Sequence, residues 1–256
     1  MYEYQSKMNP KKYRRILEDK ILFLREYNQF ITRTYCTLND LLCGEHDRVD
    51  KIINSSKKLV LKNSLGQQGK TVRVLHQPGH DKQALIRHMR SHNFDLVEEY
   101  VIQHPLLMQL APSGLNTVRI VTQLVDANVV ILCARLRICI DNEIDNLSAG
   151  NAAAMIDIDT GKIPEPAVFA DPRHQDLQRH PITGVSIVGF TLPYWGQVIE
   201  MVKAAALLHP QNRSVGWDIA IRDNGPELIE ANHNWGKLLW QLPAKRGLKS
   251  QLSRYS

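Results

Sequence analysis

The sequence predicts an α+β protein of two lobes with mainly antiparallel sheets, residues 1–104 and 105–256. Two observations support this prediction. Segments with helical spacing of apolar residues are separated by β-rich runs. The β-rich runs occur as neighbours joined by short polar turns, and they are denser in the second half.

The first lobe begins with a predicted helix over residues 10–30, where Pro10 suits the first turn. Two β-rich runs, 59–61 and 71–75, flank a polar glycine loop and predict a hairpin. The rest of the lobe is predicted as a helix over 82–92 and a strand over 94–103.

The second lobe opens with two neighbouring strands, 116–125 and 128–140. A strand with an Asp-Thr-Gly turn follows at 151–163, and residues 193–210 form the clearest helix, which Pro210 ends. A final hairpin precedes a segment that we expect to be a short polar tail.

Composition indicates an ordinary globular protein, with 43% hydrophobic and 23% charged residues. The net charge of +6 favours anionic partners, although a merely basic surface is the alternative. No basic stripe with interleaved aromatic residues occurs, so nucleic acid is not expected as a partner. No apolar run reaches the roughly 20 residues of a membrane span, and the start lacks a secretory stretch, so we expect a cytoplasmic protein.

The cysteines do not form a metal or disulfide pattern. None of the four belongs to a Cys-x-x-Cys pair, and two of them lie within an apolar run. We therefore expect buried free thiols rather than a zinc site or disulfide bonds.

The stretch "GWDIAIRDNGPELIEANHN", residues 216–234, carries three oxygen ligands within predicted strands. The apolar residues on both sides share odd parity, which fits a three-residue loop that ends at Gly225. That register places Asp218 opposite Glu230, with Asn232 next on the same face. Carboxylate and amide oxygens suit Mg²⁺ that holds phosphates, and a solvated polar face is the alternative.

The loop "KNSLGQQGK" is a candidate phosphate site. Its backbone N–H groups at Gly66, Gln67, Gln68 and Gly69 can wrap phosphate oxygens, and Lys62 enters from the preceding strand. The spacing is not that of a P-loop, and a simple hairpin is the alternative.

Three arginines lie within the paired apolar strands of the second lobe: Arg119, Arg135 and Arg137. A guanidinium in such a strand must find an anion or reach solvent. Arg135 and Arg137 share parity, so both can point into one cleft, and an exposed sheet face is the alternative.

Taken in order, these motifs resemble the ATP-grasp superfamily of carboxylate–amine ligases over about residues 10–236. The resemblance rests on "ILEDKILF", "LVLKNSLGQQGK", "DLVEEYV" and "IEANHNWG". The stretches "NTVRIVT", "DNLSAGN", "VGFTLPYW" and "VGWDIAI" resemble the sugar-transfer-associated branch more closely. The resemblance implies an ATP-grasp fold, in which two lobes enclose the nucleotide.

The resemblance also implies the roles of individual residues. Lys20, Lys62 and the loop Gly66, Gln67, Gln68 and Gly69 would contact ATP phosphates, and Glu98, Glu99, Tyr100 and Val101 would form the adenine hinge. Asp218, Glu230 and Asn232 would hold Mg²⁺, with Mn²⁺ as the alternative metal. Arg119, Arg135 or Arg137 would steady the transferring phosphoryl group. Asn146, Ser148 and Asn151 would line the acceptor side, although Asn151 replaces a glycine that is usual in the family.

The implied reaction activates a carboxylate as an acyl phosphate and couples it to an amine, such as amino acid–sugar amide formation in surface-polysaccharide synthesis. The alternatives are ligation onto a peptide or protein and a nucleotide-binding module without turnover. Only about 57 residues precede the glycine loop. A partner chain or a second copy is therefore a candidate source of the surface that an N-terminal domain supplies in relatives.

Overall fold

The computed structural model describes residues 1–44, 47–54, 58–66, 72–76, 81–141, 147 and 150–255. Internal contacts divide the chain into two units, one of residues 19–101 and one of residues 1–18 together with 102–256. This division differs from the predicted boundary, because the first 18 residues lie in the larger unit.

The smaller unit contains a four-stranded antiparallel sheet in the order β1-β4-β2-β3. The strands are β1 (Tyr35–Thr37), β2 (Leu59–Lys62), β3 (Val72–Leu75) and β4 (Leu96–Glu99). The unit also contains α3 (Lys20–Glu26), the short 3-10 helix η1 (Asn28–Phe30), α4 (Leu38–Cys43), α5 (Asp47–Ile53) and α6 (Lys82–Ser91). The predicted hairpin around the glycine loop is confirmed by the pairing of β2 with β3.

Side-chain alternation divides the two faces of this sheet. Leu59 and Leu61 point into a core formed with α4, α5 and α6. Lys62 has the opposite parity and lies on the other face, together with Glu98, whose partner on β2 is Val60. The alternation thus keeps one face of the sheet apolar and leaves the other for charged groups.

The single helix predicted over residues 10–30 is wrong. The chain forms α2 (Arg15–Glu18) in the larger unit and then α3 in the smaller one. The Asp19 carboxylate accepts hydrogen bonds from the backbone N–H groups of Ile21 and Leu22, so it starts a new helix. A capping residue therefore interrupts an apolar pattern that continues on both sides.

The larger unit contains a six-stranded antiparallel sheet in the order β10-β9-β5-β6-β7-β8. The strands are β5 (Val118–Val125), β6 (Asn128–Ile138), β7 (Ala152–Ile156), β8 (Val168–Phe169), β9 (Ser214–Arg222) and β10 (Gly225–Asn232). The helices are α1 (Tyr2–Met8), α2, α7 (Pro105–Leu110), α8 (Trp195–Leu208), α9 (Lys237–Gln241) and α10 (Lys249–Leu252), with the 3-10 turns η3 (Leu242–Ala244) and η4 (Ser253–Tyr255).

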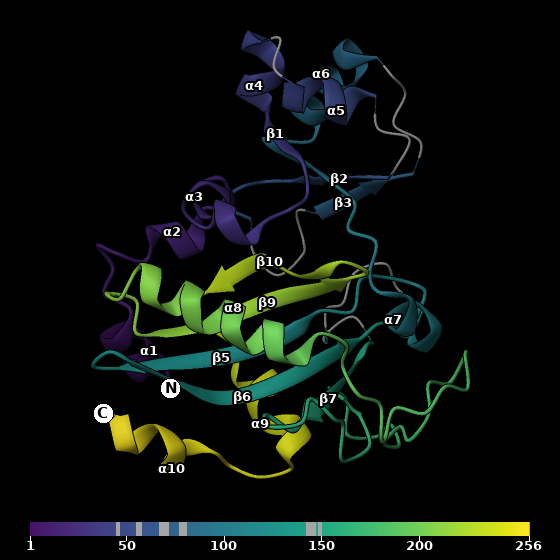
Figure 1. Cartoon of the computed structure of the whole chain (residues 1–256). Helices are drawn as coiled ribbons and strands as arrows, with labels where there is room; N and C mark the ends of the chain where they lie inside the picture. The colour runs from purple at the N-terminus through teal and green to yellow at the C-terminus, as the bar shows by residue number, and fades with distance from the viewer. Residues whose placement is uncertain are drawn as a thin grey trace. The chain divides into compact units, whose positions relative to one another are not determined.

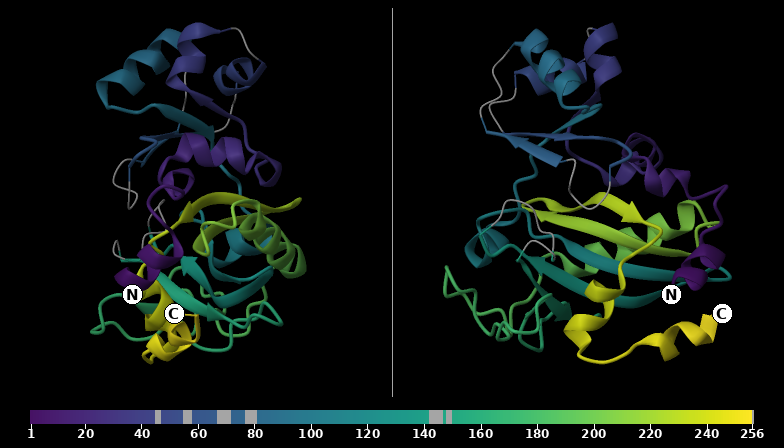
Figure 2. Two further views of the ribbon diagram at one scale, coloured as in Figure 1. Left: turned by 90° about the vertical axis from the view of Figure 1, so that its left-hand side faces the viewer. Right: turned by 180° about the vertical axis from the view of Figure 1, so that it is seen from behind.

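Both faces of this sheet are covered. Helix α8, which confirms the helix predicted for residues 193–210, lies across one face and contacts β5, β6, β9 and β10 (Figure 1). The view from behind shows the C-terminal segment on the opposite face (Figure 2). There Trp240, Leu248 and Leu252 pack with Tyr4 and Met8 of α1, and with Val121 and Cys133 of the sheet.

The predicted polar tail is therefore wrong, because residues 237–255 fold into short helices that bury apolar side chains. The apolar residues in this segment are few and spread over several short turns, so no helical period is visible in the sequence.

The cysteines follow the prediction in part. All four are described and are free thiols, but Cys43 is exposed, whereas Cys36, Cys133 and Cys139 are buried. Burial raises the pKa of the Cys36 thiol to about 12. Within the described residues, no helix is long and apolar enough to cross a membrane.

Candidate functional site

In the smaller unit, Glu98 is the centre of a buried charge cluster. The Glu98 carboxylate accepts a hydrogen bond of 2.6 Å from Lys62 Nζ and one of 3.0 Å from Arg33 Nε. Burial by itself would raise the pKa of Glu98, but the charges of Arg33 and Lys62 outweigh it and lower the pKa to about 2. Glu98 is therefore ionised, and its side chain fixes Lys62 on the polar face of the sheet.

The other predicted hinge residues are held by a side-chain hydrogen bond, a backbone hydrogen bond and burial. Glu99 accepts a hydrogen bond of 2.9 Å from the backbone N–H of Thr34. The N–H of Tyr100 donates to the Lys58 carbonyl at 3.0 Å, and Val101 is buried. The chain thus leaves β4 in a defined backbone path.

The first half of the glycine loop is held by two side chains. Asp95 accepts hydrogen bonds from the backbone N–H of Ser64 at 2.6 Å and from its hydroxyl at 2.5 Å. Lys20 Nζ donates to the Gly66 carbonyl, so this lysine lies beside the loop. Gln67, Gln68 and Gly69 lie outside the described residues.

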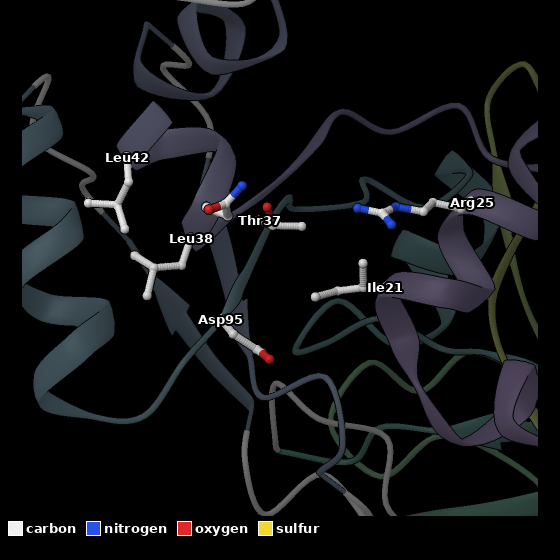
Figure 3. Close-up of a pocket in the computed structure, with 7 residues that line it drawn as sticks. Ile21, Arg25, Thr37, Leu38, Leu42 and Asp95 are labelled. Carbon is white, nitrogen blue, oxygen red and sulfur yellow. The ribbon is translucent and has the colours of Figure 1, made fainter. Parts of the chain in front are cut away.

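The smaller unit also contains a cavity of about 390 Å³. Leu38 and Leu42 line it on one side, and Ile21 and Arg25 of α3 lie on the other (Figure 3). Asp95 borders the cavity, but both of its carboxylate oxygens already accept from Ser64. None of the predicted site residues lines this cavity, and we assign it no role.

In the larger unit, four charged residues form a row across the sheet. The register places Glu230 opposite Asp218, Asp218 opposite Arg119, and Arg119 opposite Arg135. Cross-strand partners share a face, and this is the face that the two chain termini cover. The predicted pairing of Asp218 with Glu230 is confirmed.

The reason for this pairing differs from the prediction. The loop has only two residues, because Arg222 pairs with Gly225, and Gly225 has a φ of +124°. The extra residue is a β-bulge at Ile229, between the pairs of Leu228 and Glu230. A three-residue loop and a two-residue loop with a bulge give the same parity beyond the bulge.

Asp218 is fully buried between two arginines. Both of its oxygens accept from Arg119, one of them at 2.8 Å from Nη2, and Arg137 Nη2 lies 2.7 Å from Oδ2. Burial opposes ionisation, but the charges of Arg119 and Arg137 lower the pKa of Asp218 well below its usual range. The carboxylate is therefore ionised and links both guanidinium groups.

Arg135 bonds backbone carbonyls and not Asp218. Its Nη1 donates to the Ala134 carbonyl and its Nη2 to the Trp240 carbonyl, both at 2.8 Å. Within the described residues it forms no ion pair with a carboxylate, and burial lowers the pKa of its guanidinium. The structure thus groups Arg119 with Arg137 and joins Arg135 to the C-terminal segment.

Asp218, Glu230 and Asn232 are the side chains of this row that could hold a metal ion. Asn232 Nδ2 lies 3.3 Å from Glu230 Oε1, so the amide adjoins the carboxylate that faces Asp218. A carboxylate has about four lone-pair positions. The arginines make three contacts with Asp218, and Glu230 makes a further side-chain hydrogen bond with it, so a cation bound here would replace that contact between Asp218 and Glu230. Two carboxylates and an amide are the hard oxygen donors that Mg²⁺ prefers.

The predicted acceptor residues are described only in part. Asn151 is fully buried, and its Oδ1 accepts from the Ile140 backbone N–H at 3.0 Å. Asn146 and Ser148 lie outside the described residues.

Sequence reasoning missed a buried polar network beside this segment. Asn116 bonds to Gln103 through both its backbone and its side chain, and its Oδ1 accepts from the Cys139 N–H. His180 Nε2 lies 2.9 Å from the Cys139 carbonyl. These residues lie far apart in the sequence, so no local pattern identifies them. Arg33, the second partner of Glu98, was missed for the same reason.

Comparison with solved structures identifies the fold of this chain. The structure of an L-amino acid ligase from Bacillus licheniformis aligns with a TM-score of 0.50 and 14% identity over 90% of this chain and 43% of that one. The structure of the ATP-grasp ligase PsnB with precursor peptide PsnA2 and AMPPNP aligns with a TM-score of 0.56 and 14% identity. That alignment covers 97% of this chain and 60% of PsnB. A D-alanine–D-alanine ligase from Bacillus anthracis aligns with a TM-score of 0.50 and 16% identity. That alignment covers 93% of this chain and 66% of the ligase. The chain therefore has the ATP-grasp fold, as predicted.

The sequence places the chain more narrowly within that class. The family described as sugar-transfer-associated ATP-grasp matches residues 1–256, so the chain belongs to this family. No curated protein shows significant sequence similarity to it. The chain spans less than two thirds of the length of each of these three ligases.

Proposed function

We propose that this protein is an ATP- and Mg²⁺-dependent ligase that joins a carboxylate to an amine. The observation that supports it best is the row in which Glu230, Asp218 and Arg119 lie side by side on a chain of the ATP-grasp family. Such a row combines oxygen ligands for a metal with cations for a phosphoryl group.

The proposed reaction has two steps. The substrate carboxylate attacks the γ-phosphorus of ATP, which forms an acyl phosphate and releases ADP. The amine then attacks the acyl carbon, loses a proton and displaces inorganic phosphate, which leaves an amide. Phosphoryl transfer of this kind depends on positioning and charge neutralisation rather than on a protein nucleophile.

In the smaller unit, Lys20, Lys62 and the glycine loop are proposed to contact the ATP phosphates. The Lys62 ammonium is fixed by Glu98, and Lys20 by the Gly66 carbonyl, so both are positioned before ATP binds. The Glu98 side chain is engaged in this way, so the hinge from Glu98 to Val101 would read adenine through backbone groups.

In the larger unit, Asp218, Glu230 and Asn232 are proposed to hold the metal. Bound Mg²⁺ would neutralise the phosphate charge that develops during transfer. Mn²⁺ is the alternative, because it takes the same oxygen ligands. Arg119 and Arg137 are proposed to steady the transferring group, since Asp218 holds both guanidinium groups on one side of the sheet.

For the substrates, we propose an amino acid and an amino sugar, joined during cell-surface polysaccharide synthesis in the cytoplasm. The family description, with its association to sugar transfer, supports this choice. Ligation onto a peptide is the second candidate, and the precursor peptide in the PsnB structure supports it. A partner chain or a second copy is proposed to contribute to the substrate-binding surface.

A screen for ADP release tests the function. Amino acids are paired with amino sugars, uronic acids or short peptides, with Mg²⁺ or Mn²⁺, and ADP should form only when carboxylate, amine and metal are all present. Asp218→Asn and Glu230→Gln should abolish release, whereas Asp157→Asn, a carboxylate on an exposed turn of the same unit, should not.

The arginines give a second comparison in the same assay. Arg119→Lys and Arg137→Lys should each lower the rate by about 10² to 10³, whereas Arg135→Lys should change it only a few-fold. Turnover that survives both carboxylate substitutions would exclude the proposed metal ligands. ATP binding without ADP release for any pair would instead indicate a nucleotide-binding module.

A further inference from the structure

The positive charge of the chain is concentrated at its two ends. The sequence has 32 basic and 26 acidic residues. Residues 1–18 and 233–256 hold ten of the basic residues and only two of the acidic ones, Glu3 and Glu18. These two segments therefore carry a net charge of +8, and the rest of the chain carries a net charge of −2.

The fold brings the two ends together. Tyr4 and Met8 of α1 and Leu248 and Leu252 of the C-terminal segment belong to one apolar cluster on the same face of the larger sheet. Figures 1 and 2 show the two chain ends, with α1 and α10, at the same end of the larger unit. Because their apolar sides are buried against the sheet, their charged sides face solvent. Six exposed basic residues define this terminal basic surface: Lys7, Lys11, Lys12, Arg246, Lys249 and Arg254.

Few acidic groups neutralise this surface. Glu18 pairs with Arg14 at 2.7 Å, and Asp176 pairs with Lys245, so each of these carboxylates is engaged with a cation outside the six. Glu3 is exposed on α1. Within the described residues, none of the six forms an ion pair with a carboxylate.

Exposed apolar and aromatic side chains lie among these cations. Tyr2 is 78% exposed, Tyr13 39% and Met1 37%. Lys12 Nζ lies 4.5 Å from the centre of the Tyr13 ring. Exposed lysines and arginines beside a few exposed tyrosine and methionine side chains suit binding to a lipid headgroup layer, where the charges meet anionic lipids and the rings enter the interface.

We propose that the terminal basic surface binds the anionic surface of a lipid bilayer, so that the protein is held peripherally on a membrane. A single-stranded nucleic acid is the less favoured partner, because it is bound by a cationic groove with aromatic platforms for stacked bases. The proposal rests on charge and exposure in the larger unit alone. It is therefore independent of the ligase activity.

Co-sedimentation of the full chain with vesicles tests this proposal. The protein should pellet with phosphatidylcholine vesicles that contain phosphatidylglycerol and stay in solution with pure phosphatidylcholine. Raising the salt from about 0.1 M to about 1 M should release it, because the Debye length falls from about 10 Å to about 3 Å.

Two matched triple variants identify the surface. Lys11→Gln, Lys249→Gln and Arg254→Gln together should weaken binding by about 100-fold, since each basic residue near an anionic membrane contributes about fivefold. Lys51→Gln, Arg87→Gln and Arg90→Gln remove the same charge from exposed positions of the smaller unit and should leave binding unchanged. Thermal unfolding and ADP release should be unchanged in both.

Three results would overturn the proposal. The first is equal pelleting with neutral and anionic vesicles. The second is equal loss of binding in the two triple variants, which would show that only net charge matters. The third is displacement of the protein from anionic vesicles by single-stranded DNA or RNA at lower concentration than free lipid, which would identify nucleic acid as the partner.

Discussion

At the scale of single residues, two buried carboxylates organise the charged groups of this protein. Glu98 is held by Arg33 and Lys62, and Asp218 by Arg119 and Arg137. Each carboxylate is 3% exposed or less, so its removal would take a buried counter-charge from both of its cationic partners. The same contacts that position the proposed phosphate-binding groups therefore also stabilise the fold.

Glu98→Gln should lower the free energy of unfolding by about 3 to 5 kcal/mol, because it leaves Lys62 and Arg33 without their carboxylate. Urea denaturation measures this change. Glu99→Gln is the control, since Glu99 is half-buried and accepts from the Thr34 N–H, and it should cost about 1 kcal/mol. Equal losses in the two variants would show that the Glu98 cluster stabilises the fold no more than the single hydrogen bond of Glu99 does.

The pH dependence follows from the lowered pKa of Glu98. Its folded-state pKa of about 2 lies below its ordinary value of 4.5, so ionised Glu98 stabilises the fold above pH 4.5. That contribution, about 3 kcal/mol, is lost as the pH falls toward 2. Glu98→Gln should lack this part of the acid-induced loss, whereas Glu99→Gln should keep it.

At the scale of elements, the final hairpin depends on two backbone features. The bulge at Ile229 restores the register that brings Glu230 opposite Asp218. Gly216 lies opposite Asn232, where a side chain is not tolerated, because an added Cβ would lie 2.4 Å from Trp235 Cβ and 3.3 Å from Arg119 Cδ. Strand β9 therefore accommodates both the indole and the arginine that bonds Asp218.

Gly216→Ala should lower the free energy of unfolding by about 1 to 3 kcal/mol, as expected for overpacking against a buried side chain. Gly236→Ala is the control, because nothing lies within 4 Å of an added Cβ there and its φ is negative. The measurement is the urea midpoint together with the rate of ADP release. A stable and fully active Gly216→Ala would show that Trp235 does not constrain Arg119.

At the scale of the whole molecule, the two chain ends complete the larger unit. Trp240 is 3% exposed and packs edge-to-face on Trp235, with the ring centres 5.2 Å apart. Its backbone carbonyl accepts from Arg135. The C-terminal segment is therefore part of the core on the face that carries Asp218.

Trp240→Ala should lower the free energy of unfolding by about 3 to 5 kcal/mol, because it leaves a cavity beside Trp235. Leu238→Ala lies on the same helix at 53% exposure and should change it by less than about 0.5 kcal/mol. Thermal and urea unfolding measure both variants. Comparable small effects would mean that the C-terminal helices do not support the sheet.

The sequence by itself determined the main hairpins of both sheets. β-rich runs that flank short turns predicted β2–β3 and β5–β6, and parity across the last turn predicted β9–β10 with Asp218 opposite Glu230. These are local properties, because side chains in strands alternate with a period of two and glycine marks turns. The family resemblance came from the same local motifs and is confirmed over residues 1–256.

Only the tertiary structure decided which groups meet. The parity of the apolar residues is the same whether the extra residue of the hairpin lies in the loop or in a bulge at Ile229. Arg33 lies 65 residues from Glu98, and Arg119 lies 99 residues from Asp218. The basic ends of the chain lie more than 200 residues apart in sequence and become one surface only because both bury apolar residues on the same sheet face. Packing and charge pairing act across such separations, and a local pattern does not record them.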